Sequence, residues 1–220
     1  WDFQARLMDS MDAGGPHVVL KARQIGISTT VMMQKLARCL QPARTILVVS
    51  RIERVAKELI AIARYAVKTC DPPFPVELVT DNTLELRFAN GSRMVGESAN
   101  PDTGRTFAAS DVVFDEFAYL PWQEAMWQSV RPTVSRSGNV VVLSSPSLEG
   151  ALFHTIWMQG QAPQSDWRTF ELPWRVCPDY GEEWFAHERP DFTDAQWGEE
   201  YECRFGSSQD AVFRSAYIEA

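Results

Sequence analysis

Four short runs of almost entirely apolar residues recur along the chain, and helical patterns separate them. The runs cover residues 18–20, 45–49, 112–114 and 140–143. Strands without alternating polar residues are typical of sheets that other elements cover on both faces. Strands that alternate with helices form mostly parallel sheets. The sequence therefore predicts an α/β fold with a mostly parallel central sheet flanked by helices.

The remaining elements follow from local spacing. Apolar residues recur at helical spacing over residues 1–13, 28–40 and 52–66, and strand-like runs cover residues 76–80, 83–89 and 92–97. The pair Asn90-Gly91 predicts a tight hairpin turn between the last two of these strands. From about residue 166 onward Trp, Glu and Asp become dense and strand patterns disappear. We therefore expect a core domain over residues 1–165 and a small, mainly helical subdomain over residues 166–220.

Composition narrows the class of protein. The 220 residues fit one large domain, and 45% apolar residues are enough for a real core. No apolar run approaches the roughly 18 to 20 residues that a membrane span requires. The first residue is Trp1 rather than Met, from which we expect a fragment of a longer protein. A basic start followed by an apolar stretch, as in a signal peptide, is not found. The four scattered cysteines favour a reducing compartment over a disulfide framework or zinc site.

The net charge of −8 is unevenly distributed. Residues 1–165 contain 16 Lys and Arg against 16 Asp and Glu, whereas residues 166–220 contain 5 against 13. We interpret the acidic excess as a solvated helical face. A strongly basic footprint for nucleic acid is absent, so any DNA contact is expected to be local or to come from a part of the protein outside this chain. Arg51, Arg54 and Lys57 are candidates for such a contact, although a solvated helix face explains them equally well.

A phosphate-binding loop is predicted between the first buried strand and the following helix. The usual pattern is G-x-x-x-x-G-K-[ST], in which backbone N–H groups and a lysine hold phosphates. Here Ile27 occupies the lysine position, so Lys21 at the mouth of the loop is expected to supply the cation, with Arg23 as the second candidate. Ser28 is placed to bind Mg²⁺, and Thr29 is the neighbouring alternative. The expected nucleotide contacts in this loop are Gln24, Ile25, Gly26, Ile27, Ser28 and Thr29.

An acidic pair, Asp115-Glu116, ends the apolar run at 112–114. A carboxylate at the end of a buried strand can hold Mg²⁺, and a second can act as general base toward water. We assign Asp115 to magnesium and Glu116 to the base. The alternatives are that both acids cap the next helix and that Ser28 is an ordinary helix N-cap. Loop and pair lie about 90 residues apart with a further strand and helix between them, as in ATPases with a strand inserted between the two motifs.

These segments resemble the motifs of the large terminase subunits of tailed bacteriophages. Residues 23–29 resemble the family's R-Q-x-G-K-[ST]-T Walker A loop, and residues 104–121 resemble its arginine-bearing loop followed by the Walker B motif. Ser144-Ser145-Pro146 is similar to the coupling motif, for which a simple turn is the alternative. Residues 1–4 resemble the adenine-recognition element, and residues 199–205 resemble the segment that closes the motor domain.

The resemblance implies a P-loop NTPase of the RecA-like (ASCE) type with a helical lid, which uses ATP and Mg²⁺ to drive double-stranded DNA into a procapsid. It implies that Gln4 reads the base, that Ser144 and Ser145 sense the γ-phosphate, and that Arg105 acts on a neighbour's nucleotide. A surface arginine is the alternative for Arg105. The implied partners are the portal protein, the small terminase subunit and further copies in a ring in the host cell cytoplasm, although the isolated domain could be a monomer. A nuclease domain would follow residue 220, so this chain should not cleave DNA.

Two other functions stay open at this point. A helicase-like ATPase would require a second RecA-like domain, for which 220 residues leave no room. A nucleotide-binding scaffold could assemble on ATP with little or no hydrolysis, and the displaced lysine motivates this alternative. The pair Asp115-Glu116 speaks against it, because a protein that only binds nucleotide needs no residue to activate water.

Overall fold

A single eight-stranded sheet forms the centre of the molecule. The computed structural model describes residues 1–105, 108–137 and 139–206, including all their side chains except those of residues 133–137. The strands lie in the order β3-β4-β5-β2-β6-β7-β1-β8. They span β1 His17–Lys21, β2 Thr45–Ser50, β3 Leu78–Asp81, β4 Glu85–Phe88, β5 Arg93–Ser98, β6 Asp111–Asp115, β7 Asn139–Ser144 and β8 Arg168–Leu172. Neighbouring strands pair in parallel, except that β4 runs antiparallel to both β3 and β5.

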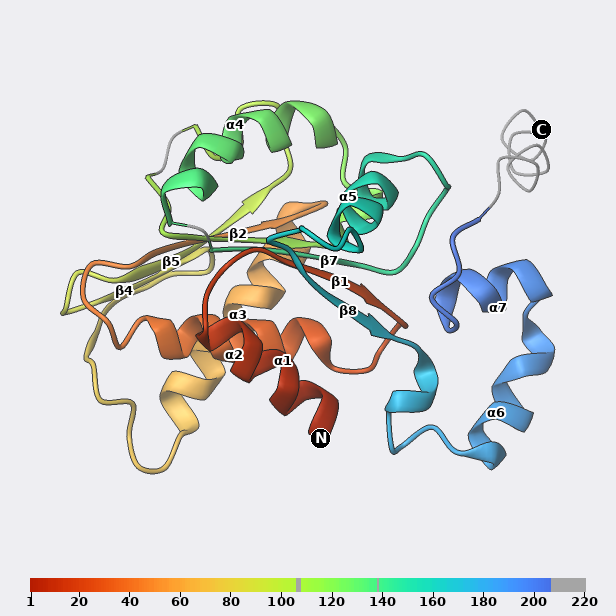
Figure 1. The fold of residues 1–220 in the computed structure, drawn as a ribbon. Coiled ribbons are helices and arrows are strands. Elements are labelled where there is room, and N and C mark those ends of the chain that lie inside the picture. The colour runs from red at the N-terminus through yellow and green to blue at the C-terminus, as the bar shows by residue number, and fades with distance from the viewer. Residues whose placement is uncertain (106–107, 138, 207–220) are drawn as a thin grey trace.

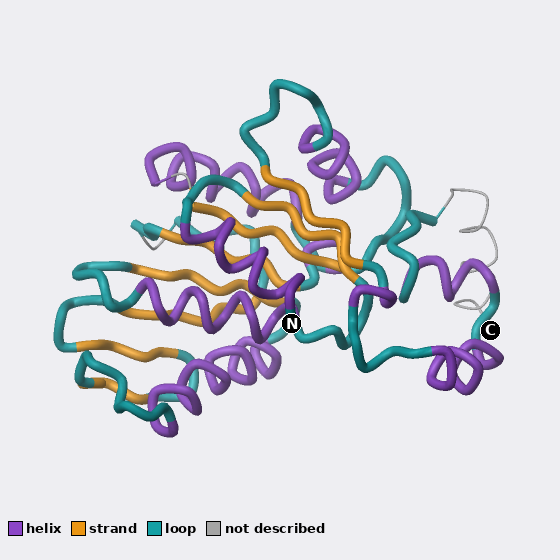
Figure 2. Tube along the Cα trace, turned by 60° about the horizontal axis from the view of Figure 1, so that its bottom comes forward, coloured by secondary structure: helices purple, strands orange, loops and turns teal. Residues whose placement is uncertain are grey.

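Helices cover both faces of this sheet. On one face lie α1 (Asp2–Asp12), α2 (Ile27–Arg38) and α3 (Glu53–Thr69), and on the other lie α4 (Gln123–Ser137) and α5 (Leu152–Gly160), as Figure 1 shows. Figure 2 shows the strands as a layer between these helices. Beyond the sheet follow α6 (Glu182–Glu188) and α7 (Asp194–Glu200). Short 3₁₀ turns are η1 (Phe117–Tyr119), η2 (Trp174–Val176) and η3 (Arg189–Asp191).

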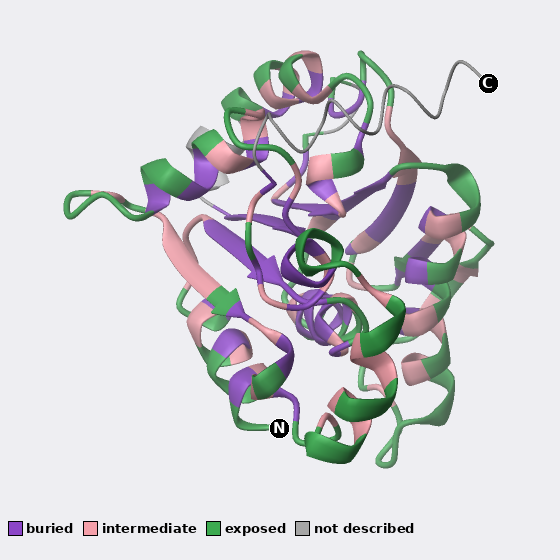
Figure 3. Cartoon of the chain, turned by 90° about the vertical axis from the view of Figure 1, so that its right-hand side faces the viewer, coloured by how far each residue is buried: buried purple, intermediate pink, exposed green. Residues whose placement is uncertain are grey.

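The central strands carry the core. Every residue of β1, β6 and β7 is buried, and the side chains on the two faces of the sheet belong to two separate apolar clusters. Figure 3 shows that burial is concentrated along these strands. Among the described residues, the helices do not combine the length and apolar character that crossing a bilayer requires. The predicted α/β fold with a mostly parallel, doubly covered sheet is therefore confirmed.

The predicted helices and strands up to residue 98 are present, with boundaries that differ by a few residues. The hairpin at Asn90-Gly91 is confirmed, because the Gly91 N–H donates to the Phe88 carbonyl at 3.0 Å and Gly91 has a φ of 83°. The prediction that strands end before residue 166 is wrong. Strand β8 pairs with β1 at the edge of the sheet, where its residues are mostly half-buried and therefore lack an apolar run.

The segment that follows β8 is held by aromatic side chains. Trp174 stacks on Phe185 with ring centroids 5.3 Å apart, and Trp197 packs against Tyr201 at 4.4 Å. This part is helical as expected, whereas its division from the core at residue 165 stays a prediction, and residues 207–220 lie outside the described residues. Its acidic residues do not all form a solvated face. The half-buried Glu202 accepts hydrogen bonds from the Trp174 and Trp197 indoles, at 3.0 and 3.1 Å.

Candidate active site

The loop between β1 and α2 turns sharply and opens toward solvent. Gln24 and Gly26 both have left-handed backbone conformations, with φ of 57° and 77°. The left-handed conformation favours glycine at position 26, and a Cβ atom there would lie 2.7 Å from Gln4 Nε2 and displace the end of that side chain. A hollow of about 370 Å³ lies against this turn and is lined by residues 21–29 and Glu116. We call it the loop hollow. Because α2 begins at Ile27, the hollow lies at a helix N-terminus, where free N–H groups favour anions.

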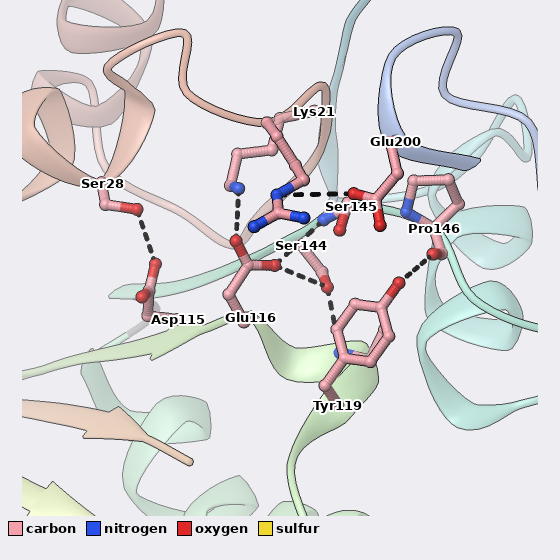
Figure 4. A network of polar contacts seen from close by, with 11 residues as sticks. Lys21, Ser28, Asp115, Glu116, Tyr119, Ser144, Ser145, Pro146 and Glu200 are labelled. Atoms are coloured by element: carbon pink, nitrogen blue, oxygen red, sulfur yellow. Dashed lines mark hydrogen bonds and ion pairs between the residues drawn. The ribbon is translucent and has the colours of Figure 1, made fainter. Parts of the chain in front are cut away.

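Lys21 lies between the loop and the acidic pair. It is the last residue of β1 and only 4% exposed, and its Nζ donates to Glu116 Oε1 at 2.6 Å (Figure 4). Arg23 is exposed, and its Nε lies 3.5 Å from Glu200 Oε2. In this structure both candidate phosphate cations are therefore paired with a carboxylate.

Asp115 lies opposite the start of α2. Its Oδ1 accepts a hydrogen bond from Ser28 Oγ at 2.7 Å, so Ser28 does not cap the helix, whose N-cap is Gly26. Burial raises the pKa of Asp115, and the neighbouring Glu116 charge raises it further, against the opposing effects of Lys21 and Ser28. A bound cation would therefore stabilise the ionised form of the Asp115 carboxylate. One hydroxyl and one carboxylate fit Mg²⁺, which takes few protein ligands and completes its shell with water and phosphate oxygens.

Glu116 is held by the neighbouring strand as well as by Lys21. Its Oε2 accepts hydrogen bonds from the Ser145 N–H at 3.2 Å and from Ser144 Oγ at 3.4 Å, at the end of β7 (Figure 4). Burial alone would raise the pKa of Glu116, but the Lys21 ammonium and these hydrogen bonds outweigh it and lower the pKa. Glu116 is therefore ionised at neutral pH, as a general base must be.

A second hollow of about 390 Å³ adjoins the first, with which it shares Arg23 and Glu116. We call it the carboxylate hollow. Its lining comes from the loop after β1, from the ends of β2, β6 and β7, and from α3, η1 and α7. It consists of Arg23, Ser50, Arg51, Val55, Asp115, Glu116, Tyr119, Ser145, Glu199 and Glu200. The Tyr119 hydroxyl donates to the Pro146 carbonyl at 2.7 Å and so links the turn after β6 to the turn after β7.

Comparison with known proteins identifies the family. The family model described as "Terminase large subunit, T4likevirus-type, N-terminal" matches residues 18–219, which include both the loop and the acidic pair. The chain belongs to this terminase family.

Solved terminase structures share the fold. A mutant ATPase domain of the large terminase from Thermus phage P74-26 superposes with a TM-score of 0.77 at 21% identity, over 93% of each chain. The large terminase of another thermophilic bacteriophage, solved with ADP, gives a TM-score of 0.72 at 7% identity. That match covers 92% of this chain and 52% of the other, so the terminase domain described here spans about half of that ADP-bound protein.

The structure of this terminase domain brings most of the predicted site residues together. Gln4 Nε2 donates to the Ile25 carbonyl at 3.4 Å, which places Gln4 against the loop. The side chains of Ile25 and Ile27 are buried in the core, so they can offer only backbone groups to a ligand, whereas Thr29 is exposed. Arg105 lines neither hollow and pairs with Asp102 at 2.9 Å.

Sequence reasoning missed several residues around the site. Glu200 of α7 lines the carboxylate hollow and pairs with Arg23, and the Tyr180 hydroxyl donates to the Gln24 carbonyl at 3.2 Å. These contacts join residues about 150 or more positions apart, so no local pattern could indicate them. For Tyr119, the signal available was its position three residues after Glu116.

Proposed function

We propose that this terminase domain binds Mg-ATP in the loop hollow and hydrolyses it to drive double-stranded DNA into a viral procapsid. The observation that carries the proposal is the convergence of Lys21, Ser28, Asp115 and Glu116 at one edge of the sheet, beside a loop at a helix N-terminus. Family membership supports a role in the DNA-packaging motor. The large terminase of the thermophilic bacteriophage compared above, which shares the fold, has been solved with ADP and with ATP-gamma-S.

The residues divide the work of hydrolysis between them. The backbone N–H groups of the loop and the Lys21 ammonium bind the phosphates. Ser28 and Asp115 hold Mg²⁺, which when bound offsets negative charge on the phosphate oxygens. Glu116 orients the attacking water and accepts its proton.

The ion pair between Lys21 and Glu116 implies that ATP binds before Glu116 becomes active as a base. While Lys21 neutralises Glu116 at 2.6 Å, the carboxylate is a weak base. A bound phosphate anion competes for the same ammonium, so binding of ATP frees Glu116 when its substrate is in place. After hydrolysis, the contacts of Glu116 with Ser144 and Ser145 provide a route by which loss of the γ-phosphate reaches β7.

The larger assembly belongs to the same proposal. Gln4 reads the adenine base, and residues after β8 act as a lid over the nucleotide. Arg105, which is exposed and lines neither hollow, acts on the nucleotide of a neighbouring copy in a ring. The portal protein, the small terminase subunit and the procapsid in the host cytoplasm complete the motor. The second candidate function is an ATP-dependent assembly scaffold, which the displaced lysine still favours.

Replacement of Lys21 by alanine is expected to lower Mg-ATP turnover about a hundredfold, because one charge-assisted contact to the transferred phosphoryl group is lost. Arg23→Ala is expected to have a smaller effect, since Arg23 is exposed and is held by Glu200. Phosphate release at saturating ATP measures both. Normal turnover in Lys21→Ala together with loss in Arg23→Ala would make Arg23 the phosphate clamp.

A further inference from the structure

Among the residues that the structure describes, one arginine at the site has no carboxylate partner, unlike the other cations there. Lys21 pairs with Glu116 and Arg23 with Glu200, whereas no acidic side chain of the described residues forms an ion pair with Arg51. Arg51 is exposed and lines the carboxylate hollow together with Asp115 and Glu116. Lys21 and Arg23 must each break an ion pair with a carboxylate before they can bind phosphate. Arg51 can bind phosphate without breaking an ion pair.

Arg51 and Glu116 follow neighbouring strands of the sheet and line the same hollow. Strands β2 and β6 are parallel neighbours, and Val49 pairs with Phe114. Arg51 and Glu116 each follow two residues later, just beyond the paired residues, so both leave the sheet at the same edge. A hydrogen bond stabilises the turn that carries Arg51: the hydroxyl group of the buried Ser50 donates to the Ile52 carbonyl at 3.0 Å.

We infer that Arg51 binds the γ-phosphate of ATP and thereby lets the domain distinguish ATP from ADP. This inference rests on the proposed function. A base that activates water must lie within one water of the γ-phosphorus, so the terminal phosphate is the phosphate that faces Glu116. Arg51 lines the same hollow as Glu116 and is therefore the unpaired cation available to this phosphate. The planar guanidinium suits this role because it can bind two phosphate oxygens at once. ADP lacks the group that Arg51 contacts.

Calorimetric titration of the chain with Mg-ATPγS and with Mg-ADP tests the inference. We expect Arg51→Ala to weaken ATPγS binding about ten- to a hundredfold, the usual effect of losing a hydrogen bond to a charged group. ADP binding should change by less than about twofold. Arg51→Lys, which keeps the charge, should restore part of the lost affinity. The matched control is Arg54→Ala, because Arg54 is exposed, pairs with Glu58 and does not line the hollow.

Unchanged ATPγS binding in Arg51→Ala would overturn the assignment, and so would an equal loss of affinity for ATPγS and ADP. The wild-type titrations separate this outcome from failure of the proposed function. If the wild-type chain binds neither nucleotide, the ATP site itself is wrong. If it binds both and Arg51→Ala alters neither, only the role of Arg51 is wrong.

Discussion

Replacement of Glu116 by glutamine is expected to lower ATP turnover about 10²- to 10⁴-fold while nucleotide binding is retained. The amide keeps the size of the side chain but cannot accept a proton from water. It also cannot form the ion pair with Lys21, so the ammonium becomes available to phosphate without competition. We therefore expect ATP to bind at least as tightly to the variant as to the wild-type chain.

Single-turnover phosphate release and equilibrium binding measure the two effects separately. Glu124→Gln is the matched control, because Glu124 is exposed on α4 and lines neither hollow. It should turn over at the wild-type rate. Wild-type turnover in Glu116→Gln would remove Glu116 from the role of base, and loss of binding would show that the carboxylate serves the fold or the loop instead.

Replacement of Asp111 by alanine is expected to lower the free energy of unfolding by about 3–5 kcal/mol, the usual cost of leaving a buried charge without its partner. Asp111 is fully buried, and its Oδ1 lies 3.1 Å from Lys35 Nζ and 2.7 Å from Arg38 Nε. Burial already lowers the pKa of Lys35, and Asp111 opposes that shift. Without the carboxylate, the buried Lys35 and the partly buried Arg38 of α2 lose the counter-charge that lies closest to them.

Urea denaturation measures this loss, and Asp102→Ala is its control. Asp102 forms an exposed pair with Arg105, so its removal should change the unfolding free energy by less than about 1 kcal/mol. A loss below about 1 kcal/mol in Asp111→Ala would mean that the buried cations find water or other partners. The position of this cluster matters for the site, because it ties the end of α2 to the start of β6. The opposite ends of these elements carry Ser28 and Asp115.

The central sheet and the chemical motifs could be predicted from the sequence because their signals are local. Strands covered on both faces show as apolar runs, and Asp115-Glu116 follows such a run directly. Parallel strands then bring the loop after β1 and the acids at the end of β6 to the same edge of the sheet. Ser28 and Asp115, which are 87 positions apart, meet there at 2.7 Å.

The contacts that could not be predicted depend on tertiary structure. Lys35 and Arg38 on α2 have the spacing of an ordinary solvated basic pair, and only the packing of α2 on the sheet buries them against Asp111. Strand β8 lies at an edge and alternates polar with apolar residues, so it lacks the signal of its neighbours. Glu200 reaches the site because the aromatic cluster after β8 folds α7 back toward the loop.

Release of phosphate from ATP by the wild-type chain, measured with and without Mg²⁺ across a range of protein concentrations, tests the central claim most directly. The account predicts magnesium-dependent turnover, because Ser28 and Asp115 of one chain are proposed to hold the metal. It also predicts that turnover rises faster than linearly with concentration, because Arg105 is proposed to act on the nucleotide of a neighbouring copy. ATP binding without turnover at any concentration would contradict the account and favour the assembly scaffold.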